Sequence, residues 1–214
     1  MTYRTENEAK IDKLTQQLAQ ANNELIQIKL DMDKQNQFGR REMIRIHNIE
    51  EPSLPSGEYE NVQDTVMNVL KEAGIEIEEN MISSAQRLPA RRVDGATKSK
   101  PITFTLTRRY DRNRILRLKK KQMKDNQSFQ RKYPKVFMTE DLTPLRQHMA
   151  YRLRKDDKIA VTWSIDGRIK CLKKDFKKDD KPDTIDTPYD LGKVGWSKEE
   201  IEEFIKTNLT KNKD

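Results

Sequence analysis

The sequence has little of the chemistry on which most catalytic centres depend. Among its 214 residues are two histidines, His47 and His148, one cysteine, Cys171, and seven glycines. The histidines lie far apart, so no histidine–cysteine spacing indicates a zinc site. No serine or cysteine lies in a nucleophile motif, and no glycine-rich loop could cradle phosphates, which excludes a P-loop. We therefore expect no enzyme, no catalytic residue, no metal and no cofactor.

Long apolar runs are also missing. No run approaches the ~20 residues that cross a membrane, and the polar N-terminal residues do not resemble a signal peptide. Hydrophobic residues make up 34% of the chain and charged residues 36%, which favours small domains and an extended helix over one large core. A single cysteine permits no disulfide within the chain, so we expect a reducing intracellular compartment.

Positive charge is concentrated in one part of the chain. The net charge is +8, yet residues 42–85 carry −8 and residues 86–135 carry +14. The stretch 108–124, RRYDRNRILRLKKKQMK, has nine Lys or Arg among seventeen residues and predicts a helix anchored by Ile115 and Leu118. Cations held so closely repel one another, and a bound polyanion relieves that repulsion. A solvated helix face is the alternative, but the polarised charge favours nucleic acid.

Residues 4–36 carry a heptad repeat. Its a and d positions are Ile11, Leu14, Leu18, Ala21, Leu25, Ile28 and Met32. This narrow apolar stripe predicts a coiled-coil oligomerisation helix over residues 1–38. A single amphipathic helix packed on its own domain is the alternative. The repeat leaves dimer, trimer and tetramer open, and Gly39 ends the pattern.

Residues 39–141 predict a domain of four strands and two helices. The expected strands are 42–49, 81–88, 100–107 and 135–139. A helix capped by Asn61 and ended by Gly74 lies between the first two strands, and the basic helix lies between the last two. The order β-α-β-β-α-β is the split, ferredoxin-like arrangement, in which both helices cover one face of the sheet.

Residues 142–214 predict a small α+β domain. Thr143 and Pro144 start a helix, and residues 159–172 form a hairpin around Asp166-Gly167. Residues 174–194 resemble a linker, and a capping box at Ser197 starts a terminal helix over residues 197–208. The fold class is therefore α+β, with an N-terminal coiled-coil helix and two small domains.

The hairpin could add to a binding surface. A two-residue turn would place Trp163 across from Lys170, with Arg168 close by. Core packing is the alternative role for Trp163, because large aromatic side chains are usually buried.

A four-stranded split sheet suggests an RNA-recognition motif, which stacks bases on aromatic side chains. The segment 44–49, IRIHNI, follows the first-strand signature of that motif, but Arg45 stands where the aromatic residue is expected. The third strand presents Thr103, Thr105 and Thr107 in place of an aromatic platform. We therefore expect mainly cation–phosphate attraction, with little sequence preference.

From Gly39 to about Phe176, the chain resembles the first-open-reading-frame protein of LINE-type (non-LTR) retrotransposons. The matching landmarks come in order: a heptad coiled coil, MIRIHNIEEP, an acidic helix, SSAQRL, KPITFTL, RNRILRLKKK, FMTEDLTPLRQ and VTWSIDGRIK. The resemblance covers about two thirds of the chain, and its specificity rests on the order and spacing of the landmarks.

The resemblance implies a trimer held by a parallel coiled coil, an RNA-recognition-like domain and a C-terminal domain. It implies low-specificity binding of single-stranded RNA and DNA, nucleic-acid chaperone activity and packaging of the element's transcript into cytoplasmic ribonucleoprotein particles, with the nucleus left open. Arg45 and Arg87 match positions that contact nucleic acid in that family. Where the family often has basic residues on the third and fourth strands, this chain has Thr105 and Phe137.

We therefore expect an oligomeric single-strand-binding protein whose contacts are cationic. The predicted nucleic-acid-binding residues are Arg45, Arg87, Arg91, Arg92, Arg108, Arg109, Arg112, Arg117, Lys119, Lys120, Lys121, Arg168 and Lys170. The alternative is a coiled-coil interaction scaffold whose basic surface only aids solubility. Salt separates the two, because cation–phosphate binding weakens steeply as salt rises.

Overall fold

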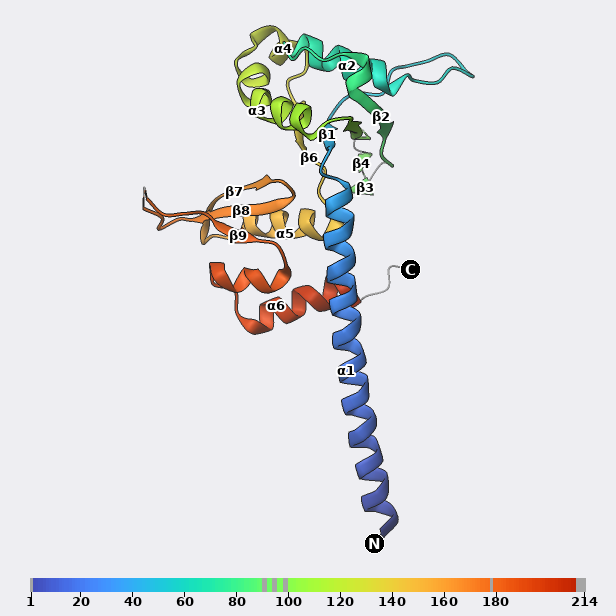
Figure 1. Ribbon diagram of the computed structural model, residues 1–214, viewed down its shortest axis with the longest axis vertical. Helices are drawn as coiled ribbons and strands as arrows, with labels where there is room; N and C mark the ends of the chain where they lie inside the picture. Colours follow the sequence, from blue (N-terminus) through green and yellow to red (C-terminus); the bar gives the residue numbers. More distant parts are fainter. Residues whose placement is uncertain (1, 90–91, 94–95, 98–99, 178, 211–214) are drawn as a thin grey trace. The chain divides into compact units, whose positions relative to one another are not determined.

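The computed structural model describes residues 2–89, 92–93, 96–97, 100–177 and 179–210, and for residues 2–6, 92–93, 96–97, 120 and 124 the backbone alone (Figure 1). The chain is mixed α+β, with a long N-terminal helix and antiparallel sheets, as the sequence predicts. It divides into two compact units, Met1–Phe38 with Thr143–Asp214, and Gly39–Leu142.

The Gly39–Leu142 unit is built on a four-stranded antiparallel sheet with strand order β2-β5-β1-β6. The strands are β1 (Met43–His47), β2 (Ile82–Arg87), β5 (Ile102–Leu106) and β6 (Phe137–Glu140). The helices are α2 (Val62–Glu72), α3 (Arg109–Asp125) and α4 (Gln127–Lys132), with a short 3-10 helix at Glu79–Met81. Two short strands, β3 (Arg92–Val93) and β4 (Ala96–Thr97), pair with each other.

Side-chain alternation in β1 decides which face of this sheet is covered. Ile44 and Ile46 are fully buried together with Phe104 of β5. They pack with Leu70 of α2 and Ile115 of α3 in one apolar core. Since neighbouring side chains of a strand point to opposite faces, Arg45 and His47 lie on the face away from that core.

Local signals place α2 correctly. The Asn61 side chain accepts hydrogen bonds from the backbone N–H groups of Gln63 and Asp64, as an N-cap does. Gly74 follows the helix with φ +77°, a conformation that favours glycine. Both assignments confirm the boundaries that the sequence predicts.

The segment between α3 and β6 contains a helix that the sequence analysis did not predict. It contains α4, which the Asn126 side chain caps by accepting from the N–H of Phe129. Phe129 is buried in the core of the unit. The strand that follows begins at Phe137, two residues later than expected. One buried ring thus orders a segment too short to show helical periodicity.

The other unit joins α1 (Thr2–Gly39) to the C-terminal elements. These are α5 (Pro144–Lys155), β7 (Ile159–Ile165), β8 (Arg168–Lys173), β9 (Asp183–Ile185), the 3-10 helix η2 (Pro188–Val194), α6 (Lys198–Ile205) and the π-helical turn η3 (Lys206–Thr210). The strands form a sheet in the order β7-β8-β9. Trp163 pairs with Lys170 across the hairpin, as predicted.

The prediction of a linker over residues 174–194 is wrong for its second half, residues 183–194, which is a structured part of the fold. It contains β9 and η2, whose Ile185 and Leu191 are fully buried. The Asp190 carboxylate accepts from the N–H of Thr187 in a capping box. Strand β9 has only three residues, so its pairing with β8 depends on contacts remote in the sequence.

Helix α1 packs on this unit through one face and leaves its heptad stripe exposed. Leu30 is buried in the core with α5 and the sheet. Arg146 donates to Asp33 at 2.9 Å, and the N–H of Thr143 donates to Oε1 of Gln37 at 2.9 Å. The stripe lies elsewhere on the helix: its large side chains, from Ile11 to Met32, are 54–63% exposed, and Ala21 is exposed as well. The helix therefore packs on its own unit through residues such as Leu30, Asp33 and Gln37, and not through the heptad stripe, as the alternative interpretation of the heptad would require.

Candidate nucleic-acid interface

Helix α3 sorts its cations between two faces. Ile115 and Met123 are buried against the sheet, which fixes the rotation of the helix. At 3.6 residues per turn, Arg117 and Lys121 then lie on the opposite side, and Arg109 lies at the edge of that side in the first turn; all three are exposed. We call this set, together with the neighbouring Tyr110, the α3 outer face.

The α3 outer face has the composition of a phosphate-binding surface. At a rise of about 1.5 Å per residue, Arg109 and Lys121 lie about 18 Å apart along the helix. The Tyr110 side chain is 71% exposed, so a ring is available beside the cations. The acidic residue Asp111 points the other way and is buried. Arg108, which precedes the helix, is exposed at the same end.

Two predicted contact residues of α3 point inward instead. Arg112 donates from Nη2 to Oε1 of Glu140 at 2.6 Å, and the two side chains are 4% and 6% exposed. Lys119 donates from Nζ to the carbonyl of Met138 at 2.8 Å. Burial lowers the pKa of Lys119, with Glu140 acting in the opposite direction. Both residues hold α3 against β6.

Arg45 also has a carboxylate partner. Its Nη2 donates to Oδ1 of Asp141, and Arg40 donates to the other oxygen of the same group at 2.7 Å. The Arg45 side chain is 12% exposed. A phosphate at Arg45 would have to compete with this buried carboxylate.

Arg87 is held by four groups of its own unit. It donates to Glu60 through Nε at 2.5 Å and Nη2 at 2.9 Å, a two-point contact. It also donates at 2.9 Å to the carbonyls of Ile49, Glu50 and Lys100. The hydrogen bonds from Arg87 lower the pKa of Glu60, and burial opposes them. Arg87 therefore secures the loop before α2.

Three predicted contacts cannot be compared with the structure in the same way. Arg91 lies outside the described residues, and so do the side chains of Arg92 and Lys120. The exposed α3 outer face is defined without them.

The hairpin cations lie on the C-terminal sheet. Arg168 is exposed and lies 3.6 Å from Asp186, while Lys170 donates to the Thr184 hydroxyl of β9. Trp163 is half-buried and is not part of the buried core. Ile165, two residues further along β7, is exposed. This face therefore combines apolar surface with two cations, of which Arg168 lies near a carboxylate and Lys170 is hydrogen-bonded to a hydroxyl.

An aromatic pair that we did not predict lies on the four-stranded sheet. His47 of β1 and Phe137 of β6 pair directly across the two strands. Their rings stack with centroids 4.4 Å apart and planes inclined by 9°. The sequence shows the alternation of β1 and shows Phe137 where the LINE-type family often has a basic residue. The pairing of β1 with β6 joins residues ninety positions apart, so the sequence does not show that the two rings meet.

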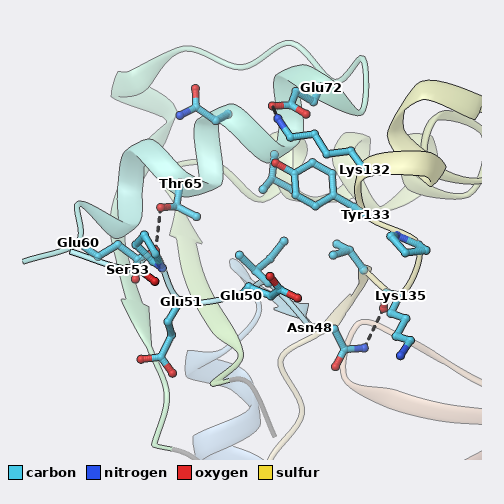
Figure 2. Close-up of a pocket in the computed structure, with 16 residues that line it drawn as sticks. Asn48, Glu50, Glu51, Ser53, Glu60, Thr65, Glu72, Lys132, Tyr133 and Lys135 are labelled. Atoms are coloured by element: carbon cyan, nitrogen blue, oxygen red, sulfur yellow. Dashed lines mark hydrogen bonds and ion pairs between the residues drawn. The ribbon is translucent and has the colours of Figure 1, made fainter.

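An open cleft of about 890 Å³ lies at one end of the same sheet (Figure 2). Ile49, Val69 and Val136 contribute apolar surface to it, and the ring of Tyr133 faces it. Its carboxylates include Glu60 and Glu72, which pair with Arg87 and Lys132. Two further carboxylates, Glu50 and Glu51, line the cleft. Lys132 and Lys135 also line it, so the cleft carries charges of both signs.

Other kinds of site have less support. Among the residues that the structure describes, no group of three or more His, Cys, Asp or Glu is placed to hold a metal ion. Over the same residues, no helix combines the length and apolarity that a membrane span needs.

Two comparisons with known proteins found no relative of this chain. No protein-family model matches the chain. A search of curated proteins also finds no significant match.

Proposed function

We propose that the chain is a self-associating, low-specificity single-stranded nucleic-acid-binding protein without a catalytic centre. The observation that carries the proposal is the α3 outer face, where Arg109, Arg117 and Lys121 are exposed along one helix. Cations in such a row attract a sugar–phosphate chain whatever its sequence. The resemblance to LINE-type first-open-reading-frame proteins adds RNA packaging and chaperone activity in ribonucleoprotein particles to the proposal.

The proposed fold of the Gly39–Leu142 unit is RNA-recognition-like. Its strand order β2-β5-β1-β6 and the packing of α2 and α3 in one core with the sheet support a split β-α-β-β-α-β arrangement. In this proposal, nucleic acid binds through cations on the helix side of the unit. The first-strand Arg45 and the second-strand Arg87 have a structural role, because Asp141 and Glu60 neutralise them.

Self-association would use the heptad stripe of α1. Residues Asp33 and Gln37, which bind the C-terminal elements, lie at heptad positions b and f when Ile11 is counted as a. Those positions point away from an a/d seam. A second and third helix could therefore pack on the stripe without displacing the docked elements. A trimer would present three α3 outer faces, and avidity would rise if one strand spans them.

Salt-dependent binding tests the proposal. We would measure anisotropy of a labelled single strand of about 30 nucleotides with the full chain, and with Arg109→Ala/Arg117→Ala/Lys121→Ala. If the three cations each contact a phosphate, the slope of log K against log salt falls in magnitude by about two. A matched control, Arg154→Ala/Lys155→Ala/Lys177→Ala, removes the same charge from exposed residues of the other unit.

The outcomes separate nucleic-acid binding from the interaction scaffold. The assignment of the α3 outer face as the binding surface is supported if the control variant keeps the parent's slope and the α3 variant has a shallower one. Equal losses in both variants would show that only the net charge matters. No binding by the parent at low salt would leave the scaffold as the better explanation.

A further inference from the structure

The His47–Phe137 pair is an exposed ring surface on the sheet. Phe137 is 48% exposed although His47 stacks on it. The neighbouring residues of the two strands, Ile46 and Met138, are buried on the helix side. Because side chains alternate along a strand, His47 and Phe137 lie on the opposite face, away from α2 and α3.

One hydrogen bond holds the His47 ring, and a second joins the two chain segments beside the ring pair. Nε2 of His47 lies 3.0 Å from the hydroxyl of Thr139, which is on β6 beyond Phe137. Just outside the two strands, the Asn48 side chain donates to the carbonyl of Lys135 at 2.8 Å (Figure 2). The pair thus lies on two hydrogen-bonded strands and needs no rearrangement before it binds a ligand. A site on rigid elements loses little conformational entropy on binding.

We propose that the Phe137 ring, backed by His47, stacks an unpaired nucleobase of the bound strand. Nearly parallel rings at this spacing are in the stacked geometry that aromatic groups favour, and a base would add one more layer. Bases stack on aromatic side chains with little regard to sequence, because every base has a π-face. The proposal rests on the proposed single-strand binding and adds to the cation contacts on the helix side a contact with the bases on the opposite face of the same unit.

Lys135 supplies the charge that this ligand requires. Its side chain is exposed, and its carbonyl accepts a hydrogen bond from Asn48, the residue that follows His47. A cation beside a stacking ring can bind the phosphate next to the stacked base. The two carboxylates at the far end of β6, Glu140 and Asp141, are buried against Arg112 and Arg45, so their charge is already balanced.

A ring pair of this kind can also serve only the sheet, because cross-strand aromatic neighbours stabilise paired strands. The two roles differ in what they recognise. A stacking surface distinguishes a strand with bases from a strand without them, whereas a structural pair does not.

The test compares two labelled strands of equal length, one of mixed sequence and one of abasic sugar–phosphate units, on the full chain. For Phe137→Ala we expect about tenfold weaker binding of the mixed-sequence strand and unchanged binding of the abasic strand. Phe137→Trp should keep the parent's affinity, and its added indole should be quenched by the mixed-sequence strand alone. Tyr151→Ala, which removes an exposed ring from α5, is the matched control and should change neither affinity.

Three results would overturn the proposal. The first is equal weakening of both strands by Phe137→Ala. The second is a lower unfolding temperature for Phe137→Ala with unchanged affinity for both strands, which would mean a purely structural pair. The third is a Phe137→Trp indole that the mixed-sequence strand does not quench. If the parent binds neither strand, the failure lies with the proposed function, and the ring proposal fails with it.

Discussion

Arg112 and Glu140 form an ion pair in the interior of the Gly39–Leu142 unit, with Nη2 and Oε1 2.6 Å apart. The pair joins the most basic helix of the chain to the last strand of the sheet. A cation in a basic stretch can thus be a structural residue. Structural cations and binding cations should differ in what their removal changes, stability in the first case and affinity in the second.

Removing one partner of this pair should cost stability rather than affinity. Arg112→Ala leaves the Glu140 carboxylate buried without its main counter-charge, so the free energy of unfolding should fall by about 3 kcal/mol. Arg117→Ala, at an exposed position of the same helix, should change it by no more than about 0.5 kcal/mol. Urea denaturation of the two variants makes the comparison. Similar values for both would mean that the pair contributes little.

The heptad stripe should control the oligomeric state. Leu18→Asp/Leu25→Asp places two charges in the proposed seam, so self-association should be lost. Affinity for a long single strand should then fall by about 10²-fold or more, because avidity is lost. Sedimentation and strand-binding measurements report the two effects. Gln16→Asp, on the exposed f position of the same helix, should change neither, and a double variant that still self-associates would contradict the role of the stripe.

Stability should fall at alkaline pH because of Cys171. Burial raises the pKa of the Cys171 thiol to about 11, whereas the pKa of an unfolded thiol is about 8.5. Between these values the unfolded chain releases the proton and the folded chain keeps it, so stability falls as pH rises. The loss should reach about 2 kcal/mol by pH 10.

Denaturation at several pH values, compared with Cys171→Ala, isolates this contribution from the titration of lysines. The variant should show a flatter decline above pH ~8.5. Parallel curves for the two proteins would refute the assignment. Below that pH the thiol is protonated in both states, and the difference between the curves should be constant.

The Asp166-Gly167 turn should tolerate no side chain at its second position. Gly167 has φ +78°, and a Cβ there would lie 2.6 Å from Cγ of Gln37. Gly167→Ala should therefore lower the free energy of unfolding by about 2 kcal/mol or more. Gly57 also has positive φ, but a Cβ there meets nothing within 4 Å. Gly57→Ala thus measures the backbone strain alone, and an equal loss in both variants would exclude the contact with Gln37.

Local signals in the sequence predicted the parts of the fold that are themselves local. The Asn61 cap, the alternation of β1 and the Asp166-Gly167 hairpin depend on neighbouring residues, and each is present. Strand β9 and helix α4 were not predicted, because Ile185 and Phe129 are ordered by burial against remote elements. Short segments do not carry enough periodicity to reveal such packing.

The candidate site also has features that the sequence shows and features that depend on remote contacts. Composition located the cations of α3, but their sorting into buried and exposed groups depends on which side of the helix meets the sheet. The carboxylate partners of Arg45 and Arg87 lie 96 and 27 residues away, so the sequence could not show that these arginines are neutralised. The pairing of His47 with Phe137 likewise required the register of β1 and β6.

The two faces of α1 limit how that helix can change in length. An insertion of one residue between Leu18 and Leu25 would rotate the upstream stripe by about 100° relative to Asp33 and Gln37. The upstream stripe would then no longer line up with its downstream half, while the docked elements would remain in place. An insertion of seven residues nearly restores the alignment. The helix is therefore free to lengthen or shorten in whole heptads, which would change the reach of the oligomer without altering either surface.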